Sequence, residues 1–246
     1  MSAQNQIVLE GQLVPEQVES MAANGTIHLA RHRSSFSGPE LSSWQYTLVK
    51  RAIDLVASAI LMAIFAVPGI VISLAILLTS RGPVFYREQR IGRGGRTFRI
   101  FKFRSMHRDA SKRAHIAESH KDGNVLEWRM RKHLRDPRIT PIGGFLRRWS
   151  LDELPQLINV FLGEMSLIGP RPVVASELAF YGDLLPYYLA ATPGLSGLWQ
   201  VSGRSHVDYD KRSKLDATYV QSWSLKADFC ILCRTIPAVL GRIGAH

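Results

Sequence analysis

An uncharged apolar segment of 24 residues, at positions 55–78, constrains this chain more than any other feature. A stretch of this length is long enough to cross the hydrocarbon core of a bilayer as a helix. Pro68 and Gly69, however, divide it into arms of 13 and 9 residues. A helix of about 13 residues rises only about 20 Å, against a hydrocarbon thickness of about 30 Å. We therefore expect a membrane helix over residues 52–79 that breaks at Pro68.

The charges around this segment favour a helix that leaves the membrane on the side where it entered. Lys50 and Arg51 precede the segment, and Arg81, Arg87 and Arg90 follow it. A straight span would carry one basic flank to the outside, whereas basic flanks are normally retained in the cytoplasm. A re-entrant helix keeps both flanks on the cytoplasmic face. The alternative is an ordinary transmembrane helix with a proline kink, because spanning helices tolerate proline.

Composition narrows the class of partner. The net charge of +11 and the pI near 10.0 indicate an anionic partner, such as nucleic acid, an anionic membrane surface or a phosphorylated small substrate. We expect a flexible tail at 1–45, which has no sustained apolar period and no signal peptide, and a single domain at 46–246. Cys230 and Cys233 are too few for a disulfide framework, and thiols on a helix face are favoured over a redox or metal site.

A strongly basic region follows the apolar segment. Residues 81–108 carry nine Lys or Arg side chains and a single acid, Glu88. Two strand-like stretches, VFYREQRIG and TFRIFKFRSM, are joined there by the glycine-rich turn at 92–95, which predicts a β-hairpin. Three alternatives are open for what the basic hairpin contacts: lipid headgroups, nucleotide phosphates or only solvent. Residues 109–135 are polar and basic and are predicted to be helical.

The main candidate for chemistry lies at residues 147–172, RRWSLDELPQLINVFLGEMSLIGPRP. Two adjacent carboxylates, Asp152 and Glu153, follow Arg147 and Arg148 at the start of a predicted helix. The positive end of the helix dipole and the two arginines favour the ionised form of Asp152. Because an ionised carboxylate can bind a metal or attack phosphorus, phosphate chemistry is the first hypothesis.

The start of this helix has two alternative registers. Its apolar side chains recur with helical spacing and end at a glycine: Leu154, Leu157, Ile158, Phe161 and Gly163. With Ser150 as the N-cap, Glu153 completes a capping box, but Pro155 then breaks a backbone hydrogen bond. With Asp152 as the cap, Pro155 falls in the tolerated first turn. The sequence leaves both registers open.

Three later segments complete the candidate site and the fold. In GPRP, at 169–172, prolines on both sides fix the direction of Arg171, which suits bidentate binding of a phosphate. Residues 192–205 form a glycine-punctuated loop of the kind that binds ligands. Residues 224–240 are predicted to be a helix that either packs on the core or lies flat on the membrane. One face of that helix is apolar: Leu225, Phe229, Leu232, Ile236 and Val239.

Five features in a fixed order carry a resemblance to a known family. They are the basic flank with the proline-broken apolar segment, FKFRSM at 101–106, SLDELPQL at 150–157, GPRP at 169–172 and PGLSGLWQVSGR at 193–204. Together they resemble the bacterial sugar transferase family, the small monotopic phosphoglycosyl transferases that start exopolysaccharide or glycan assembly. The resemblance runs from about residue 46 to the end of the chain and is closest to the ExoY-like exopolysaccharide galactosyl-phosphate transferases.

This resemblance implies a fold class and a reaction. The fold would be α+β and mostly helical, in a monotopic membrane protein with a re-entrant helix, a small β-hairpin and amphipathic interfacial helices. The reaction would transfer a sugar 1-phosphate, of galactose or glucose, from a UDP-sugar to undecaprenyl phosphate and release UMP, with Mg²⁺ as cofactor. The protein would sit among membrane lipids on the cytoplasmic face of the bacterial inner membrane, without a nucleic acid partner, and a homodimer is among the assemblies allowed.

The resemblance also implies roles for individual residues. Asp152 would be the nucleophile that forms a covalent phosphosugar ester, and Glu153 would assist in metal binding or proton handling, so that both carboxylates are metal ligands. Lys102, Arg148 and Arg171 match basic positions near the phosphates.

At the helix break, Pro68 matches the family's proline, but the family often has Ser where this chain has Val67. The hydroxyl that could satisfy the freed carbonyl is therefore missing. Two rival functions remain. A non-enzymatic membrane-anchored protein that grips polyanions through the basic hairpin would tolerate Asp152→Asn. A metal-dependent nucleotide-sugar hydrolase would release sugar phosphate to water without any lipid.

Overall fold

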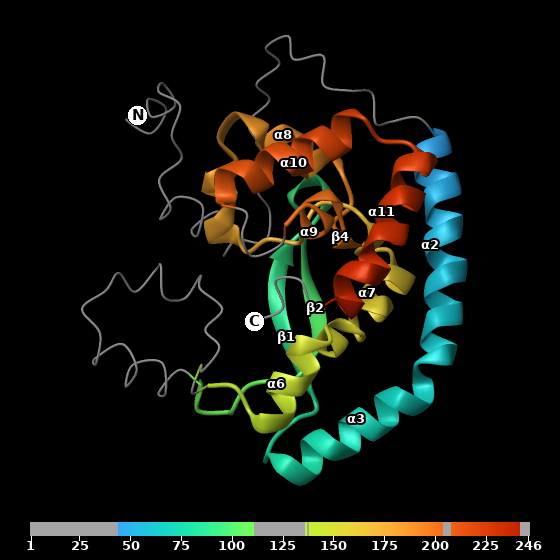
Figure 1. The fold of residues 1–246 in the computed structure, drawn as a ribbon. Helices are drawn as coiled ribbons and strands as arrows, with labels where there is room; N and C mark the ends of the chain where they lie inside the picture. The colour runs from blue at the N-terminus through green and yellow to red at the C-terminus, as the bar shows by residue number, and fades with distance from the viewer. Residues whose placement is uncertain (1–43, 111–135, 137, 204–207, 242–246) are drawn as a thin grey trace, which may run out of the picture.

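The computed structural model describes residues 44–110, 136, 138–203 and 208–241. The predicted tail at 1–45 and the predicted helix at 109–135 fall almost entirely outside these residues. The described part is mostly helical, with two small two-stranded sheets. Two long helices, α2 (Trp44–Ile64) and α3 (Ala66–Thr79), run along one side and one end of it (Figure 1).

Helices α2 and α3 form the predicted apolar segment, and they meet at a bend of 59°. Within the described residues no single helix is long and apolar enough to cross a membrane, but the bent pair meets both criteria together. Pro68 lies in the first turn of α3, and Ile64, four residues before it, ends α2. Because a proline ring clashes with the carbonyl four residues earlier, the break falls at Phe65 rather than at Pro68 itself.

The predicted β-hairpin is confirmed. Strand β1 (Phe85–Ile91) pairs antiparallel with β2 (Thr97–Phe103), and a short 3-10 turn, η1 (Arg93–Gly95), joins them. Gly94 and Gly95 have φ values of 67° and 78°, in the left-handed region that favours glycine. The glycine-rich sequence therefore gives this turn its shape, as expected.

A helix that was not expected precedes the carboxylate pair. Helix α6 (Pro141–Arg148) begins at an N-cap threonine, Thr140, whose Oγ1 accepts a hydrogen bond of 2.9 Å from the Gly143 backbone N–H. Threonine followed by proline is a recognisable helix start, because proline at the first position has no N–H to leave unsatisfied. The signal for this helix is therefore present in the sequence.

Neither of the two registers predicted for the helix after the carboxylate pair is correct. Helix α7 (Gln156–Leu162) begins after Pro155, and a separate 3-10 turn, η2 (Leu151–Glu153), comes before it. Ser150 is left-handed, at φ 56°, and its side chain makes no cap hydrogen bond, so the capping box does not form. Asp152 lies inside η2 and is not a helix cap either. Because Pro155 has no N–H, the chain completes a tighter turn before the α-helix begins.

A second small sheet joins two motifs that are far apart in the sequence. The strands β3 (Ser166–Ile168) and β4 (Gly194–Ser196) pair in parallel, and each borders a glycine motif. A Cβ added at Gly194 would lie 2.0 Å from the Gly169 N, and one added at Gly169 would lie 2.4 Å from the Thr192 O. Only glycine permits this approach, which places the GPRP turn beside the loop that follows Pro193.

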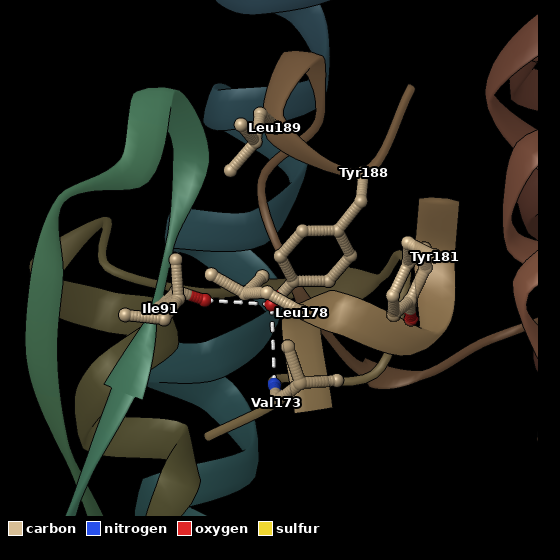
Figure 2. Packing of buried hydrophobic residues seen from close by; sticks show 6 residues of the cluster. All are labelled: Ile91, Val173, Leu178, Tyr181, Tyr188 and Leu189. Carbon is tan, nitrogen blue, oxygen red and sulfur yellow. Dashed lines mark hydrogen bonds between the residues drawn. The ribbon is translucent and has the colours of Figure 1, made fainter. Parts of the chain in front are cut away.

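A buried cluster fastens the GPRP turn to the end of the hairpin (Figure 2). The Tyr188 hydroxyl donates to the Ile91 carbonyl at 2.7 Å and accepts from the Val173 N–H at 3.1 Å. Burial raises the pKa of Tyr188, which keeps the hydroxyl protonated and able to donate. The other members come from the helices η3 (Ala175–Leu184) and α8 (Leu185–Ala190): Leu178, Tyr181 and Leu189.

Three helices complete the chain: α9 (Leu198–Val201), α10 (Tyr209–Gln221) and α11 (Leu225–Leu240). In α11 the apolar face singled out from the sequence points away from the core, since Phe229 is 65% exposed and Ile236 is 58% exposed. Ile231, off that face, is the residue that packs inside. Of the two alternatives for this face, packing on the core is therefore wrong.

Candidate active site

A polar recess lies where the hairpin, the start of α7, the GPRP turn and the β4–α9 connection meet. Ten residues line it: Arg90, Ile100, Lys102, Glu153, Gln156, Arg171, Pro172, Gly194, Leu195 and Gln200. Three of them, Lys102, Glu153 and Arg171, were site candidates from the sequence. The fold therefore brings candidates from three separate motifs into one recess.

An ion pair crosses this recess from strand β2 to the turn η2. The Nζ of Lys102 lies 2.9 Å from the Oε1 of Glu153, and the two side chains are 19% and 32% exposed. A pair with this much solvent access contributes little to stability. It leaves a cation and a carboxylate at the recess wall that a phosphate or a metal ion can engage instead of each other.

Asp152 is positioned next to this pair by the turn η2. The residue is only 8% exposed. The left-handed Ser150 redirects the chain from α6 into η2. The two leucines that flank the carboxylates, Leu151 and Leu154, pack against a buried cluster from α3, β2 and α6: Ile76, Phe103 and Leu146. Asp152 is thus held on a short, packed turn rather than on a free loop.

Arg171 is held by its turn and by an aromatic ring. Its guanidinium carbon lies 5.3 Å from the centre of the buried Trp199 ring, and that of Arg212 lies 4.3 Å from the same centre. Arg90 steadies the turn from the hairpin, because its Nη1 donates to the Pro172 carbonyl at 3.2 Å. The predicted constraint from the flanking prolines is therefore reinforced by contacts that the sequence does not show.

Arg148 is the predicted phosphate-binding residue that the structure does not place in the recess. It is the last residue of α6, it is exposed, and it does not line the recess. The recess instead holds a different cation, Arg90, which the sequence offered only as one member of the basic hairpin.

One buried amide, that of Asn159, fixes the position of α7 along strand β2. The Asn159 Oδ1 accepts from the Phe101 N–H at 3.0 Å, and its Nδ2 donates to the Arg99 carbonyl at 2.8 Å. These bonds align β2 with α7, and Lys102 of β2 then pairs with Glu153 of η2, the turn that precedes α7. At the other end of α7, Arg51 of α2 donates to the Val160 and Phe161 carbonyls, both at 2.6 Å.

The adjacent carboxylates fit the requirements of Mg²⁺. Among the described residues no group of three or more His, Cys, Asp or Glu side chains could hold a metal ion. Mg²⁺, however, usually binds through one or two carboxylates together with substrate phosphates and water. Asp152 and Glu153 can supply that pair.

Sequence analysis missed a buried carboxyl group near the two arginines that contact Trp199. Asp216 of α10 is 1% exposed, and burial raises its pKa to about 7, although the Tyr181 hydrogen bond and the charges of Arg212 and Arg171 act in the opposite direction. Gln156 and Gln200 were also missed. Gln156 stands within SLDELPQL, and Gln200 stands in the glycine-punctuated loop, so the motifs were noticed but not these side chains.

Comparison with known proteins identifies the family. The family described as "Bacterial sugar transferase" matches residues 45–242. The exopolysaccharide production protein ExoY of Rhizobium meliloti (strain 1021) is 42% identical over 200 residues, which cover 81% of this chain and 88% of that protein. The UDP-glucose:undecaprenyl-phosphate glucose-1-phosphate transferase of Caulobacter vibrioides is 41% identical over 207 residues, covering 81% and 72%.

A third relative is longer than this chain. The undecaprenyl-phosphate galactose phosphotransferase of Salmonella typhimurium is 45% identical over 199 residues, which cover 80% of this chain but only 42% of that protein. The resemblance inferred from the five ordered motifs is thus confirmed over most of the described residues. The chain belongs to the bacterial sugar transferase family.

Proposed function

We propose that this chain transfers galactose 1-phosphate or glucose 1-phosphate from a UDP-sugar to undecaprenyl phosphate, with release of UMP, as the first membrane step of exopolysaccharide synthesis. The observation that carries the proposal is the recess that gathers Lys102, Glu153 and Arg171 beside the buried Asp152. The names of the relatives in Caulobacter, Salmonella and Rhizobium support the donor, the acceptor and the pathway.

In the first half-reaction a carboxylate oxygen of Asp152 attacks the phosphorus that carries the sugar. A bond from Asp152 to phosphorus forms, the bond from that phosphorus to the oxygen of the uridine phosphate breaks, and UMP leaves. Lys102 and Arg171 balance the negative charge at phosphorus and on the departing phosphate. When bound, Mg²⁺ would neutralise part of the diphosphate charge, and Asp152 and Glu153 would hold it.

In the second half-reaction a phosphate oxygen of undecaprenyl phosphate attacks the same phosphorus. The bond to Asp152 breaks, the carboxylate is restored, and the sugar remains joined to the lipid through a diphosphate. Forming a covalent intermediate lets one recess serve a water-soluble donor and a lipid acceptor in turn.

The membrane arrangement is part of the same proposal. The bend of 59° between α2 and α3 and the outward apolar face of α11 support a re-entrant helix and an interfacial helix on the cytoplasmic face of the inner membrane. Single cysteines at Ser20 and Ser222, in a chain with Cys230 and Cys233 replaced by serine, test it. Both should react with a membrane-impermeant thiol reagent only from the cytoplasmic side. Labelling of one from the periplasm would mean that the bent pair spans the membrane.

The chemistry is tested with Asp152→Asn and a matched exposed variant, Asp183→Asn. Asp152→Asn should lower turnover at least about 1000-fold, because an amide is a poor nucleophile, while Asp183→Asn should leave it unchanged. Without any lipid, the unsubstituted enzyme should release UMP only up to the amount of enzyme present. Mass spectrometry should then find a sugar phosphate on a peptide that contains Asp152.

Each rival function predicts a different result. A hydrolase would release UMP or sugar phosphate continuously in the absence of lipid. A non-enzymatic polyanion-binding protein would release none from any UDP-sugar. UMP release that strictly requires undecaprenyl phosphate, without a trapped adduct, would mean direct attack by the lipid phosphate and would reduce Asp152 to a metal ligand or base.

A further inference from the structure

The recess contains two amide side chains that the proposed chemistry does not use. Gln156, the first residue of α7, is only 2% exposed, and Gln200 of α9 has a buried Oε1 with no hydrogen-bond partner. Both line the recess. Within the part of the chain that the structure describes, neither side chain makes a hydrogen bond.

A buried amide oxygen without a hydrogen bond, such as the Gln200 Oε1, calls for a partner. A buried polar group without a hydrogen bond destabilises a fold by about 1–3 kcal/mol, so most buried polar groups are paired. An apolar side chain would fill either position without this penalty. The recess also has an apolar wall, from Ile100, Pro172 and Leu195, so the two amides are its main uncharged polar groups.

The position of Gln156 indicates which part of a donor it meets. It lines the same recess as Glu153, the residue next to Asp152, and only Leu154 and Pro155 separate it from Glu153 along the chain. A group bound at Gln156 is therefore close to the phosphorus that Asp152 attacks. In a UDP-sugar the sugar is one oxygen away from that phosphorus, whereas the uracil is separated from it by a second phosphate and a ribose.

The chemistry of the amides matches the same part of the donor. The three cations of the recess, Arg90, Lys102 and Arg171, suit phosphate oxygens. An amide both donates and accepts, and so does each sugar hydroxyl, so the two form complementary pairs. A site that hydrogen-bonds a hydroxyl rejects a sugar in which that hydroxyl is missing or turned away, because the amide is then left unpaired.

We propose that Gln156 and Gln200 are specificity-determining residues that hydrogen-bond the hydroxyl groups of the donor's sugar. This assignment rests on the proposed function and extends it from the phosphates to the sugar.

The test measures binding and turnover separately, with Gln156→Met and Gln200→Met, which remove the amide and keep an unbranched side chain. Gln221→Met, at an exposed position at the end of α10, is the control. Binding of UDP-galactose, UDP-glucose and UDP is measured by calorimetry with Mg²⁺ in an Asp152→Asn background, so that no covalent step intervenes. The ratio of kcat/KM for the two UDP-sugars is measured with Asp152 intact.

In the two recess variants we expect binding of the preferred UDP-sugar to weaken about 3- to 10-fold, as the loss of one hydrogen bond predicts, while UDP binds as before. The preference between the two sugars should shrink. Both variants should unfold at the same temperature as the parent or higher, because the amides have no partner in the free protein. The control should change none of these quantities.

Two results would overturn the assignment while the proposed function stands. Equal weakening for UDP and UDP-sugar in an active enzyme would place the amides at the uridine diphosphate, and unchanged binding with a lower unfolding temperature would make them structural. If the chain with Asp152 intact releases no UMP from any UDP-sugar, the proposed function fails and the assignment fails with it.

Discussion

The two arms of the bent helix come from one apolar segment but meet different surroundings. Helix α2 buries three polar side chains, Lys50, Asp54 and Ser58. In α3 the one buried residue is Ile76, among the residues that the structure describes. Six other aliphatic side chains of α3 are each more than half exposed: Val67, Ile70, Val71, Leu74, Leu77 and Leu78. α2 also exposes aliphatic side chains, among them Val56, Ile60 and Ile64, so both helices have an outward apolar face, and α2 differs in its buried polar side chains.

The buried polar residues of α2 bond to two separate elements, α11 and β3. The Lys50 Nζ lies 2.5 Å from the Asp228 Oδ2 on α11, and the Asp54 Oδ1 accepts from the Leu167 N–H at 2.9 Å. Arg51 adds two bonds to the carbonyls at the end of α7. Because hydrogen bonds are directional, these contacts together fix the rotation of α2 about its axis and its position along that axis. The difference shows that charged residues at the start of α2, just before the uncharged segment, fasten this helix to α11, β3 and α7, and that hydropathy alone does not reveal these contacts.

The largest effect should come from breaking the buried pair between α2 and α11. In Asp228→Asn, Lys50 keeps its charge at 6% exposure without its carboxylate, and the loss should be about 3–5 kcal/mol in the free energy of unfolding. Chemical unfolding in detergent micelles measures it. Asp210→Asn is the control, because it breaks the exposed Lys214–Asp210 pair and should leave the free energy of unfolding nearly unchanged. Equal small losses would mean that the α2 contact is no stronger than a surface pair.

The next effect tests Ile76, the buried residue through which α3 packs on the rest of the chain. Ile76→Ala removes a fully buried side chain that packs on Phe103 and Leu146, and it should lower the free energy of unfolding by about 3 kcal/mol. Unfolding in micelles again provides the measurement. Because Leu151 and Leu154 belong to the same cluster, turnover should fall as well. A loss below about 1 kcal/mol would show that α3 is not fastened to the protein at this point.

A smaller effect is expected where α2 caps α7. Arg51→Met removes two donors from the Val160 and Phe161 carbonyls, and because one of these bonds is exposed we expect a loss of about 1.5 kcal/mol. Arg51→Lys should recover only part of it, since an ammonium cannot reproduce the planar fork. Arg93→Met, on the exposed hairpin turn, serves as the reference. Full recovery by lysine would indicate that charge alone is needed.

The smallest effect should come from the outward side of α3. Leu74→Ala should change the free energy of unfolding in micelles by less than about 0.5 kcal/mol, because this side chain is 54% exposed and touches little protein. The contrast with Ile76→Ala, two residues away, then separates the two faces of one helix. A loss above about 1 kcal/mol would instead reveal that this face packs against protein, such as a second copy of the chain.

The sequence by itself determined features that depend on short-range sterics. Pro68 broke the apolar segment because a proline ring excludes the carbonyl four residues earlier, and the turn at 92–95 formed because glycine alone enters the left-handed region at ease. Five ordered motifs also determined the family. These features need no knowledge of what packs against them.

Only the tertiary structure decided which side chains face each other or face outward. Lys102 meets Glu153 because Asn159 aligns β2 with α7, and Arg171 joins them because two glycines let β3 approach β4. The same packing left Arg148 outside the recess and turned the apolar face of α11 away from the core.

The start of α7 shows why a local sequence pattern does not by itself determine the local structure. Ser150 and Glu153 satisfy the pattern of a capping box, yet Glu153 pairs with Lys102 of a distant strand and Ser150 adopts a left-handed turn. A cap hydrogen bond and a cross-element ion pair differ by about 1 kcal/mol or less, so the segments packed around them decide the outcome. Local stereochemistry determines where the chain can turn, and the packing of distant segments determines which side chains each turn places in the recess.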